Sequence, residues 1–269
     1  MGVMVLIAGL TISERGRAYG AYETFGNFGW FLGLCSGGFL GVLLGWRLSY
    51  FLLALPILSL LPFKIKFNRT ISDTRENKGL SFLKAKRFWF IALPVILFLT
   101  NWFAVWAFVP SFLVSKGFSL EEAGITSALG IAFSVPAPFI VGSLIGKVKV
   151  GHLAVSLLAL TSLMQALLPL VPGKFSVSLL VVVIGVFQAS TSTSIFVLLT
   201  ELVSTKSLPM ISGWCVALGY GAAALGPVLF GKIADIAAFV TAFGAFSILN
   251  LLCVAAIIAN IRHTGPWSL

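Results

Sequence analysis

The sequence predicts an all-α integral membrane protein, a bundle of transmembrane helices, and three observations lead to this fold class. Of the 269 residues, 59% are hydrophobic and only 10% are charged, and the mean hydropathy is +1.06. Soluble domains carry about 25% charged residues, so most of this surface must meet lipid. The apolar runs have the length of about 20 residues that a helix needs to cross a bilayer, and they lack the alternation of a membrane-spanning strand.

Eight full spans and one partial span are predicted along the chain. Residues 1–10 are apolar but too short to cross, and they lack the basic start and the cleavage site of a signal peptide. We expect them to be the end of a helix. The full spans are predicted at 18–43, 46–63, 88–114, 121–146, 151–171, 174–200, 208–234 and 237–261. Glycine, proline and basic residues mark the joints.

Residues 64–87 differ from their surroundings, because they hold eight Lys and Arg residues and few apolar ones. We expect a soluble basic connector here. It would divide the chain into a remnant of an N-terminal helical half (1–63), the connector (64–87) and a C-terminal six-helix half (88–269).

The distribution of basic residues predicts the orientation. If the spans alternate in direction, 14 of the 18 Lys and Arg residues lie on one side, including those of 64–87, and four lie on the other. The positive-inside rule assigns the larger set to the cytoplasm. We therefore expect a multi-pass protein of the plasma membrane with the connector and the C-terminus in the cytoplasm. The net charge of +10 reflects these loops, so we expect no nucleic-acid partner.

Residues suited to enzyme, metal or cofactor chemistry are sparse. The three cysteines lie singly inside apolar runs, and the two histidines lie at span ends without partners at ligand spacing. There is no glycine-rich phosphate-binding loop followed by Lys and Ser or Thr. We expect no enzyme activity, no metal site and no cofactor.

An internal repeat links the first and the seventh span. Four glycines recur with a constant offset of 193 residues. The first set is Gly20, Gly26, Gly33 and Gly38, and the second is Gly213, Gly219, Gly226 and Gly231. Because both spans are predicted to run outward, the repeat indicates two parallel halves, a plan that recurs in secondary transporters.

The same region carries a family resemblance. The segment Glu14–Ala18 before a glycine-rich helix, with Gly45–Arg47 at its exit, resembles the fifth helix of major facilitator superfamily transporters. The connector resembles that family's central cytoplasmic loop. The family's antiporter motif is Gly, eight residues, Gly, three residues, Gly-Pro, two residues, Gly-Gly. Its positions are occupied by Gly20, Gly29, Gly33, Leu34, Gly37 and Gly38, and in the seventh span by Gly213, Ala222, Gly226, Pro227, Phe230 and Gly231.

The resemblance covers the whole chain and matches it to family helices five to twelve plus the end of helix four. It implies a secondary transporter, a permease or efflux antiporter that moves a small solute across the lipid bilayer by alternating access, with protons as the coupling ion. Alternating access needs two six-helix halves, so a second hypothesis stays open. The chain could instead be a truncated, non-transporting membrane protein or an accessory subunit that lacks the first helices.

The glycines of the two repeated spans have two interpretations. Small residues let membrane helices pack closely, so Gly26, Gly29, Gly33 and Gly37 could form a structural seam. The same seam could slide or bend during gating.

Polar residues inside the spans are candidates for binding solute or protons, since such residues are costly in lipid. Trp102 and Trp106 join them because they lie mid-span, away from the interface where tryptophans usually anchor. Glu23 is either an acid near the interface or a proton-coupling carboxylate, and Asn27 lies one turn further on the same face. The hydroxyl-rich run after Gln188 serves either packing or solute contact. The candidates are Glu23, Asn27, Asn101, Trp102, Trp106, Gln188, Thr191, Ser192, Trp214 and Tyr220.

Overall fold

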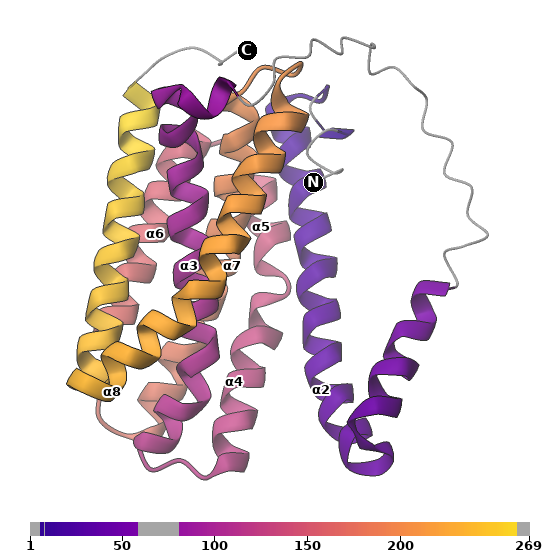
Figure 1. Ribbon diagram of the computed structural model, residues 1–269, viewed down its shortest axis with the longest axis vertical. Coiled ribbons are helices and arrows are strands. Elements are labelled where there is room, and N and C mark those ends of the chain that lie inside the picture. The colour runs from indigo at the N-terminus through magenta and orange to yellow at the C-terminus, as the bar shows by residue number, and fades with distance from the viewer. Residues whose placement is uncertain (1–5, 8, 59–80, 263–269) are drawn as a thin grey trace.

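A computed structural model gives the structure of residues 6–7, 9–58 and 81–262. In these ranges the chain is helical and contains no β-strand (Figure 1). The helices are α2 (Ile12–Leu58), α3 (Lys86–Ser115), α4 (Leu120–Ser134), α5 (Ala137–Leu144), α6 (Val150–Leu167), α7 (Lys174–Leu202) and α8 (Leu208–Arg262), with the short 3-10 helix η1 (Ser81–Lys84) before α3.

Five helical segments of the described part are long and apolar enough to cross a membrane. They are Lys86–Ser115, Leu120–Leu144, Val150–Leu167, Lys174–Leu202 and Leu208–Ile261. The second of them joins α4 and α5 across Val135 and Pro136, within the single span predicted at 121–146. The total of eight spans and a partial one stays a prediction, because residues 1–5 and 59–80 lie outside the described ranges.

The two longest helices, α2 and α8, are each broken at one place. In α2 the break is at Gly45, with φ 76° and ψ 157°, and in α8 it is at Ala237 and Ala238, the latter with φ 66° and ψ 164°. The break at Gly45 lies between the spans predicted at 18–43 and 46–63, and the break in α8 lies at the first two residues of the span predicted at 237–261. Gly45 and Ala238 are also separated by the offset of the glycine repeat, 193 residues. The repeat therefore extends from the glycine pattern to the backbone conformation that reverses the chain.

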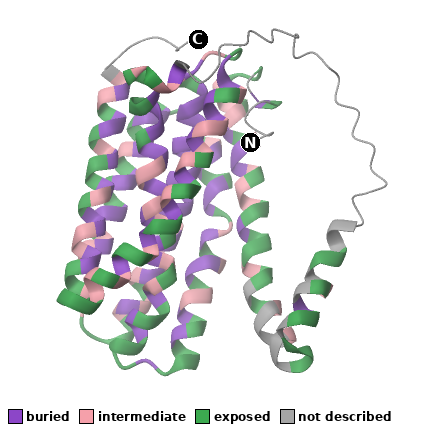
Figure 2. Ribbon diagram, viewed as in Figure 1, coloured by how far each residue is buried: buried purple, intermediate pink, exposed green. Residues whose placement is uncertain are grey.

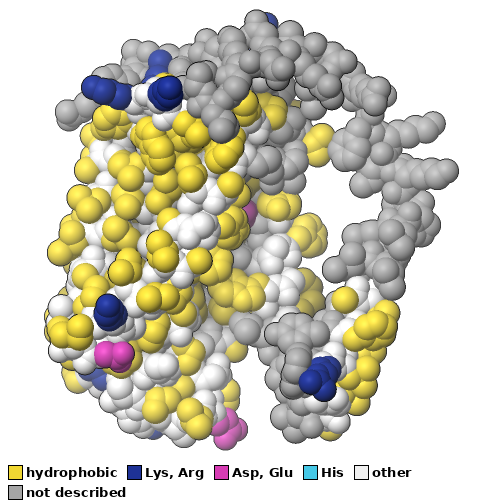
Figure 3. All heavy atoms as spheres, in the orientation of Figure 1, with side chains coloured by type: hydrophobic (Ala, Val, Ile, Leu, Met, Phe, Trp, Pro, Cys, Tyr) yellow, Lys and Arg dark blue, Asp and Glu magenta, His cyan; other side chains and the backbone are white. Residues whose placement is uncertain are grey.

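The surface of the molecule is apolar around the middle. Phe133, Leu225 and Ile248 lie near the middle of their helical segments and are 59%, 62% and 59% exposed, and many other large hydrophobic side chains are also exposed. Figure 3 shows hydrophobic side chains over most of the visible face, with Lys and Arg towards the ends. Soluble monomers rarely expose apolar surface on this scale, so this face is suited to lipid.

Helix α7 lies at the centre of the C-terminal group of helices. All residues from Gln188 to Thr200 are buried, whichever way they point. Figure 2 shows the buried residues concentrated between the helices of this group, whereas α2 is largely exposed. The hydroxyl-rich run therefore faces neighbouring helices on every side.

Helices α3 and α8 are joined by polar side chains that bond to backbone carbonyls. The side-chain amide of Asn101 donates to the Phe246 carbonyl at 2.7 Å, and that of Asn260 donates to the Phe90 carbonyl at 2.6 Å. Such interhelical hydrogen bonds add to close packing in membranes, where hydrophobicity alone does not drive helices together.

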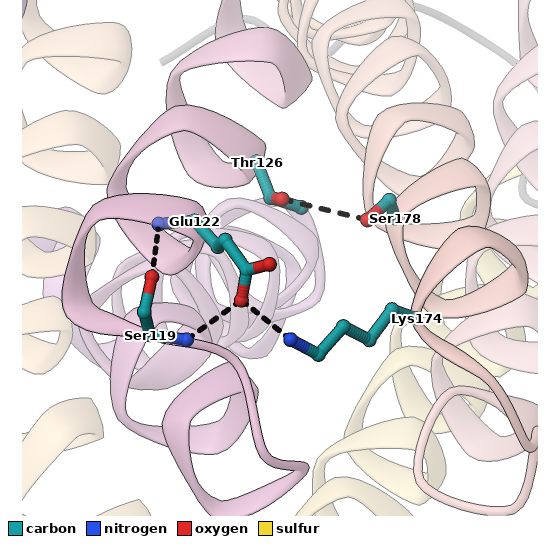
Figure 4. A network of polar contacts seen from close by, with 5 residues as sticks. All are labelled: Ser119, Glu122, Thr126, Lys174 and Ser178. Carbon is teal, nitrogen blue, oxygen red and sulfur yellow. Dashed lines mark hydrogen bonds and ion pairs between the residues drawn. The ribbon is translucent and has the colours of Figure 1, made fainter.

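At the start of α4 a polar network joins α4 to α7 (Figure 4). Ser119 and Glu122 form a capping box, and Lys174 donates to the Glu122 carboxylate at 2.6 Å. Thr126 and Ser178 share a 3.4 Å hydrogen bond one turn further. Because the Lys174 and Glu122 side chains are about half exposed, this ion pair contributes at most about 1 kcal/mol.

Helix α2 meets the C-terminal group through glycines near its start. A Cβ atom at Gly20 would overlap the Pro138 carbonyl oxygen, and one at Gly16 would lie 2.6 Å from the Gly142 carbonyl oxygen. The Arg15 guanidinium donates to the Thr200 carbonyl at 3.0 Å beside this contact. Small residues thus let the backbones of α2 and α5 touch. This contact holds the start of α2 against the C-terminal helices.

Candidate solute-binding cavity

A cavity of about 540 Å³ lies between α2 and the helices α3, α7 and α8. Its volume is in the range of about 300–1,000 Å³ typical of sites for drug-sized ligands. The lining residues are Tyr22, Glu23, Phe25, Gly26, Asn27, Trp30, Leu99, Trp102, Phe103, Ser192, Phe196 and Tyr220.

Glu23 contributes the one carboxylate of this lining. The Ser192 hydroxyl on α7 donates to Glu23 Oε2 at 3.2 Å, and the Tyr19 hydroxyl, one turn earlier on α2, also donates to the carboxylate. The described residues around the cavity include no Lys, Arg or His. The described hydrogen-bond donors of this carboxyl group are therefore neutral, and none of the lining residues is cationic.

Asn27 lies one turn after Glu23 and presents a second polar group. Its side chain is only 6% exposed, and its amide nitrogen has no hydrogen-bond partner among the described residues. Buried polar groups are nearly always hydrogen-bonded. This amide nitrogen is therefore a buried donor without a partner, on a residue that lines the cavity.

Aromatic rings form most of the remaining wall. The Trp30 ring of α2 lies 6.3 Å from that of Trp102 and 6.3 Å from that of Trp106, both on α3. Phe103 and Tyr220 meet edge to face at 5.8 Å. The Trp30 contacts join α2 and α3 through side chains alone, well removed from the backbone contact of α2 with α5.

Half of the predicted site residues line the cavity. They are Glu23, Asn27, Trp102, Ser192 and Tyr220. Thr191 instead donates to the Phe187 carbonyl of its own helix, at 2.8 Å. Trp214 packs 6.2 Å from Phe82, outside the lining.

The other three predicted residues form a buried network beside the cavity. Trp106 Nε1 donates to Gln188 Oε1 at 2.7 Å, and Gln188 Nε2 donates to Asn101 Oδ1 at 3.2 Å. Asn101 in turn bonds the Phe246 carbonyl. The network joins α3, α7 and α8, and its polar atoms are engaged with one another rather than with the cavity.

The repeated glycines differ between the two halves. In α8, Gly219, Gly226 and Gly231 pack tightly against side chains and backbone of α3, and Gly213 is half-buried. In α2, Gly20 packs on α5, whereas Gly26, Gly29 and Gly33 would meet no atom within 4 Å if they carried a Cβ. The described residues thus contain no packing partner for Gly26, Gly29 and Gly33, which were predicted to form a seam. The surroundings of Gly37 and Gly38 lie outside the described part.

Several lining residues were not among the sequence-based candidates. They are Tyr22, Phe25, Trp30, Leu99, Phe103 and Phe196. The signal was present on α2, where Tyr22, Gly26 and Trp30 follow one another at helical spacing on the face of Glu23. Aromatic residues are so common in this chain that the spacing alone did not single them out.

The described residues contain no group of three or more His, Cys, Asp or Glu side chains placed to hold an ion. The arrangement is instead suited to reversible binding of an organic solute. Its components are a carboxylate, an amide donor, hydroxyl groups and aromatic faces.

Fold and cavity together define a multi-pass helical membrane protein with a solute-sized cavity between α2 and a C-terminal group of helices. A comparison with protein families matches residues 1–214 to the Major Facilitator Superfamily. The chain belongs to this superfamily, whose members are membrane transporters, and the predicted resemblance is confirmed. The comparison with curated proteins gave no match.

Proposed function

We propose that the chain is a secondary transporter that moves a small solute by alternating access, in exchange for protons carried by Glu23. The observation that supports this most is the position of Glu23. Its carboxylate lines a solute-sized cavity between α2 and the C-terminal helices, and its hydrogen-bond donors are the neutral groups of Tyr19 and Ser192. A carboxyl group without a cationic partner in apolar surroundings can take up and release a proton as solute leaves and enters.

The test measures proton movement driven by solute in proteoliposomes that contain the purified chain and an internal pH-sensitive dye. The panel contains lipophilic amines, hexoses and organic anions. We expect at least one solute to drive protons across the membrane, and we expect Glu23→Gln to remove this response, because an amide cannot carry the proton.

Glu121→Gln is the matched control. Glu121 is exposed at the start of α4, away from the cavity, so this variant should keep the full response. Proton movement that persists in Glu23→Gln at the rate of Glu121→Gln would overturn the coupling role.

A second candidate function is an accessory or otherwise non-transporting membrane protein. It is favoured by the part of α2 beyond the cavity, where a Cβ atom at Gly29 or Gly33 would meet nothing within 4 Å and Leu32 is 47% exposed. Such a protein would bind solute in detergent but move neither solute nor protons in proteoliposomes. Comparing the two measurements on one preparation separates the candidates.

A further inference from the structure

The cavity combines one carboxyl group without a cationic lining partner, one hydrogen-bond donor without an acceptor, and many aromatic rings. We infer that its solute is a lipophilic organic monocation with an aromatic body and a hydrogen-bond acceptor near the cationic nitrogen. In this arrangement the nitrogen lies on the Glu23 carboxylate and the acceptor on the Asn27 amide. The inference rests on the proposed function only in taking this cavity as the solute site.

The sign of the solute's charge follows from the lining. Glu23 is its one carboxylate, and no Lys, Arg or His is present among the described lining residues. An ionised carboxylate has about four acceptor positions, and the Tyr19 and Ser192 hydroxyls occupy two. A cationic N–H donor fits the remaining positions and supplies the opposite charge that a partly buried carboxylate needs. An organic anion would be repelled.

The acceptor follows from Asn27, whose amide nitrogen is buried and without a partner. A carbonyl or ether oxygen of the solute would accept the hydrogen bond that this nitrogen can donate. Glu23 and Asn27 are four residues apart on one helix, which separates them by about 6 Å along the axis. The acceptor and the cationic nitrogen of the solute should therefore be separated by a similar distance.

The body of the solute follows from the rings of the wall. Trp30, Trp102, Phe103 and Tyr220 present faces and edges to the cavity. Aromatic faces attract organic cations and stack on other rings. A sugar would bring many hydroxyl groups into a wall that has few polar partners, and each unpaired group would weaken binding.

Four probes separate these features in equilibrium binding to the purified chain in detergent. Dibucaine carries an aromatic body, an amide oxygen and a tertiary ammonium group. Tetraphenylphosphonium is a lipophilic cation without an acceptor, 1-naphthamide is neutral, and 1-naphthoate is an anion. We expect dibucaine to bind most tightly, tetraphenylphosphonium next, 1-naphthamide weakly and 1-naphthoate least.

Two variants then assign the contacts. Loss of a charged hydrogen bond typically weakens binding about tenfold or more, so Glu23→Gln should weaken the binding of dibucaine by this factor. Tetraphenylphosphonium has no N–H to donate, but it should also bind less tightly because the opposite charge is lost. The affinity for 1-naphthamide should stay unchanged. Loss of a neutral hydrogen bond typically changes affinity about fivefold. Asn27→Leu should therefore weaken the binding of dibucaine to this extent and leave the affinity for tetraphenylphosphonium unchanged. Glu121→Gln is again the control and should alter no affinity.

The outcomes separate this inference from the proposed function. Binding of 1-naphthoate or 1-naphthamide as tight as that of dibucaine to the unmodified chain would overturn the inference, whether or not the variants fold. Transport of a hexose or an organic anion without binding of either cation would support the proposed function and overturn the inference. Cation binding that depends on Glu23, without transport, would support the inference and contradict the proposed function.

Discussion

Gly33 and Gly226 occupy matching positions of the internal repeat but have different surroundings. A Cβ atom at Gly226 would lie 2.5 Å from the Thr100 carbonyl oxygen of α3, whereas one at Gly33 would meet nothing within 4 Å. We expect Gly226→Ala to lower the stability of the helical bundle by about 1–3 kcal/mol, the usual effect of overpacking. Gly33→Ala, which adds the same methyl group, should leave stability unchanged or raise it slightly.

The two glycine variants can be compared by heating each in detergent and measuring the fraction that stays monodisperse on size exclusion. A midpoint for Gly33→Ala as low as that for Gly226→Ala would show that the middle of α2 is packed against a partner.

The hydrogen bond between Trp106 and Gln188 leads to a second prediction about single residues and stability. Because Trp106 Nε1 donates to the buried Gln188 Oε1, Trp106→Phe should lower stability by about 1–3 kcal/mol, the effect of leaving a buried acceptor unpaired. Trp102→Phe removes an indole that donates no described hydrogen bond, so its thermal midpoint should fall less. Equal falls in the thermal midpoints of the two variants would show that the hydrogen bond of Trp106 to Gln188 does not stabilise the bundle.

These residues also show where prediction from the sequence stops. Asn101 and Gln188 were predicted as site residues because polar groups are costly inside a span, and Trp106 because it lies mid-span rather than at the interface. The periodicity of a helix indicates which residues share a face, but it does not tell whether that face meets a cavity or another helix. Gln188 is buried and bonds to Asn101 and Trp106, both on α3, and no pattern within α7 alone contains these contacts.

At the scale of elements, the break in α8 stores backbone strain. Ala238 has φ 66° and ψ 164°, a region occupied almost only by glycine, and its repeat partner in α2 is Gly45. Such a conformation typically costs a non-glycine residue about 1–3 kcal/mol. We therefore expect Ala238→Gly to raise stability by about 1 kcal/mol, after the greater flexibility of glycine in the unfolded chain is subtracted.

Ala237→Gly provides the control for this element. Ala237 has φ −132°, which alanine adopts without strain, so glycine there should lower stability slightly. Thermal midpoints measured for both variants in one detergent check the prediction. A lower midpoint for Ala238→Gly than for the unmodified chain would contradict it.

The positions of these joints could be predicted from the sequence, because span length and joint residues follow from the thickness of the bilayer and from backbone sterics. The break within 121–146 could not. Pro136 interrupts the helix there, but Pro94, Pro110 and Pro227 lie inside continuous helices. Proline alone therefore does not fix a helix end where neighbouring helices support the backbone.

At the scale of the whole molecule, the orientation in the membrane stays a prediction from the basic residues. It can be checked with cysteine substitutions, after Cys35, the exposed native thiol, is replaced by serine. Lys116→Cys and Lys174→Cys lie at the predicted outer end, and Lys147→Cys and Lys206→Cys at the predicted cytoplasmic end.

An impermeant maleimide applied to intact cells should label the first pair of thiols and reach the second pair only after the membrane is opened. Labelling of Lys147→Cys in intact cells would contradict the predicted orientation, because it would show that the end with the basic connector lies outside the cell.

The glycine contact between α2 and α5 gives α2 the geometry of a lever. Gly20 is held near one end, and Trp30 stands about 15 Å further along the axis at 1.5 Å per residue. A tilt of about 10° around Gly20 therefore moves Glu23 by less than 1 Å, but it moves Trp30 by about 3 Å and the turn at Gly45 by about 6 Å. Small rotations of α2 around Gly20 would thus open or shut the end of the cavity that Trp30 lines, while the Glu23 carboxylate hardly moves.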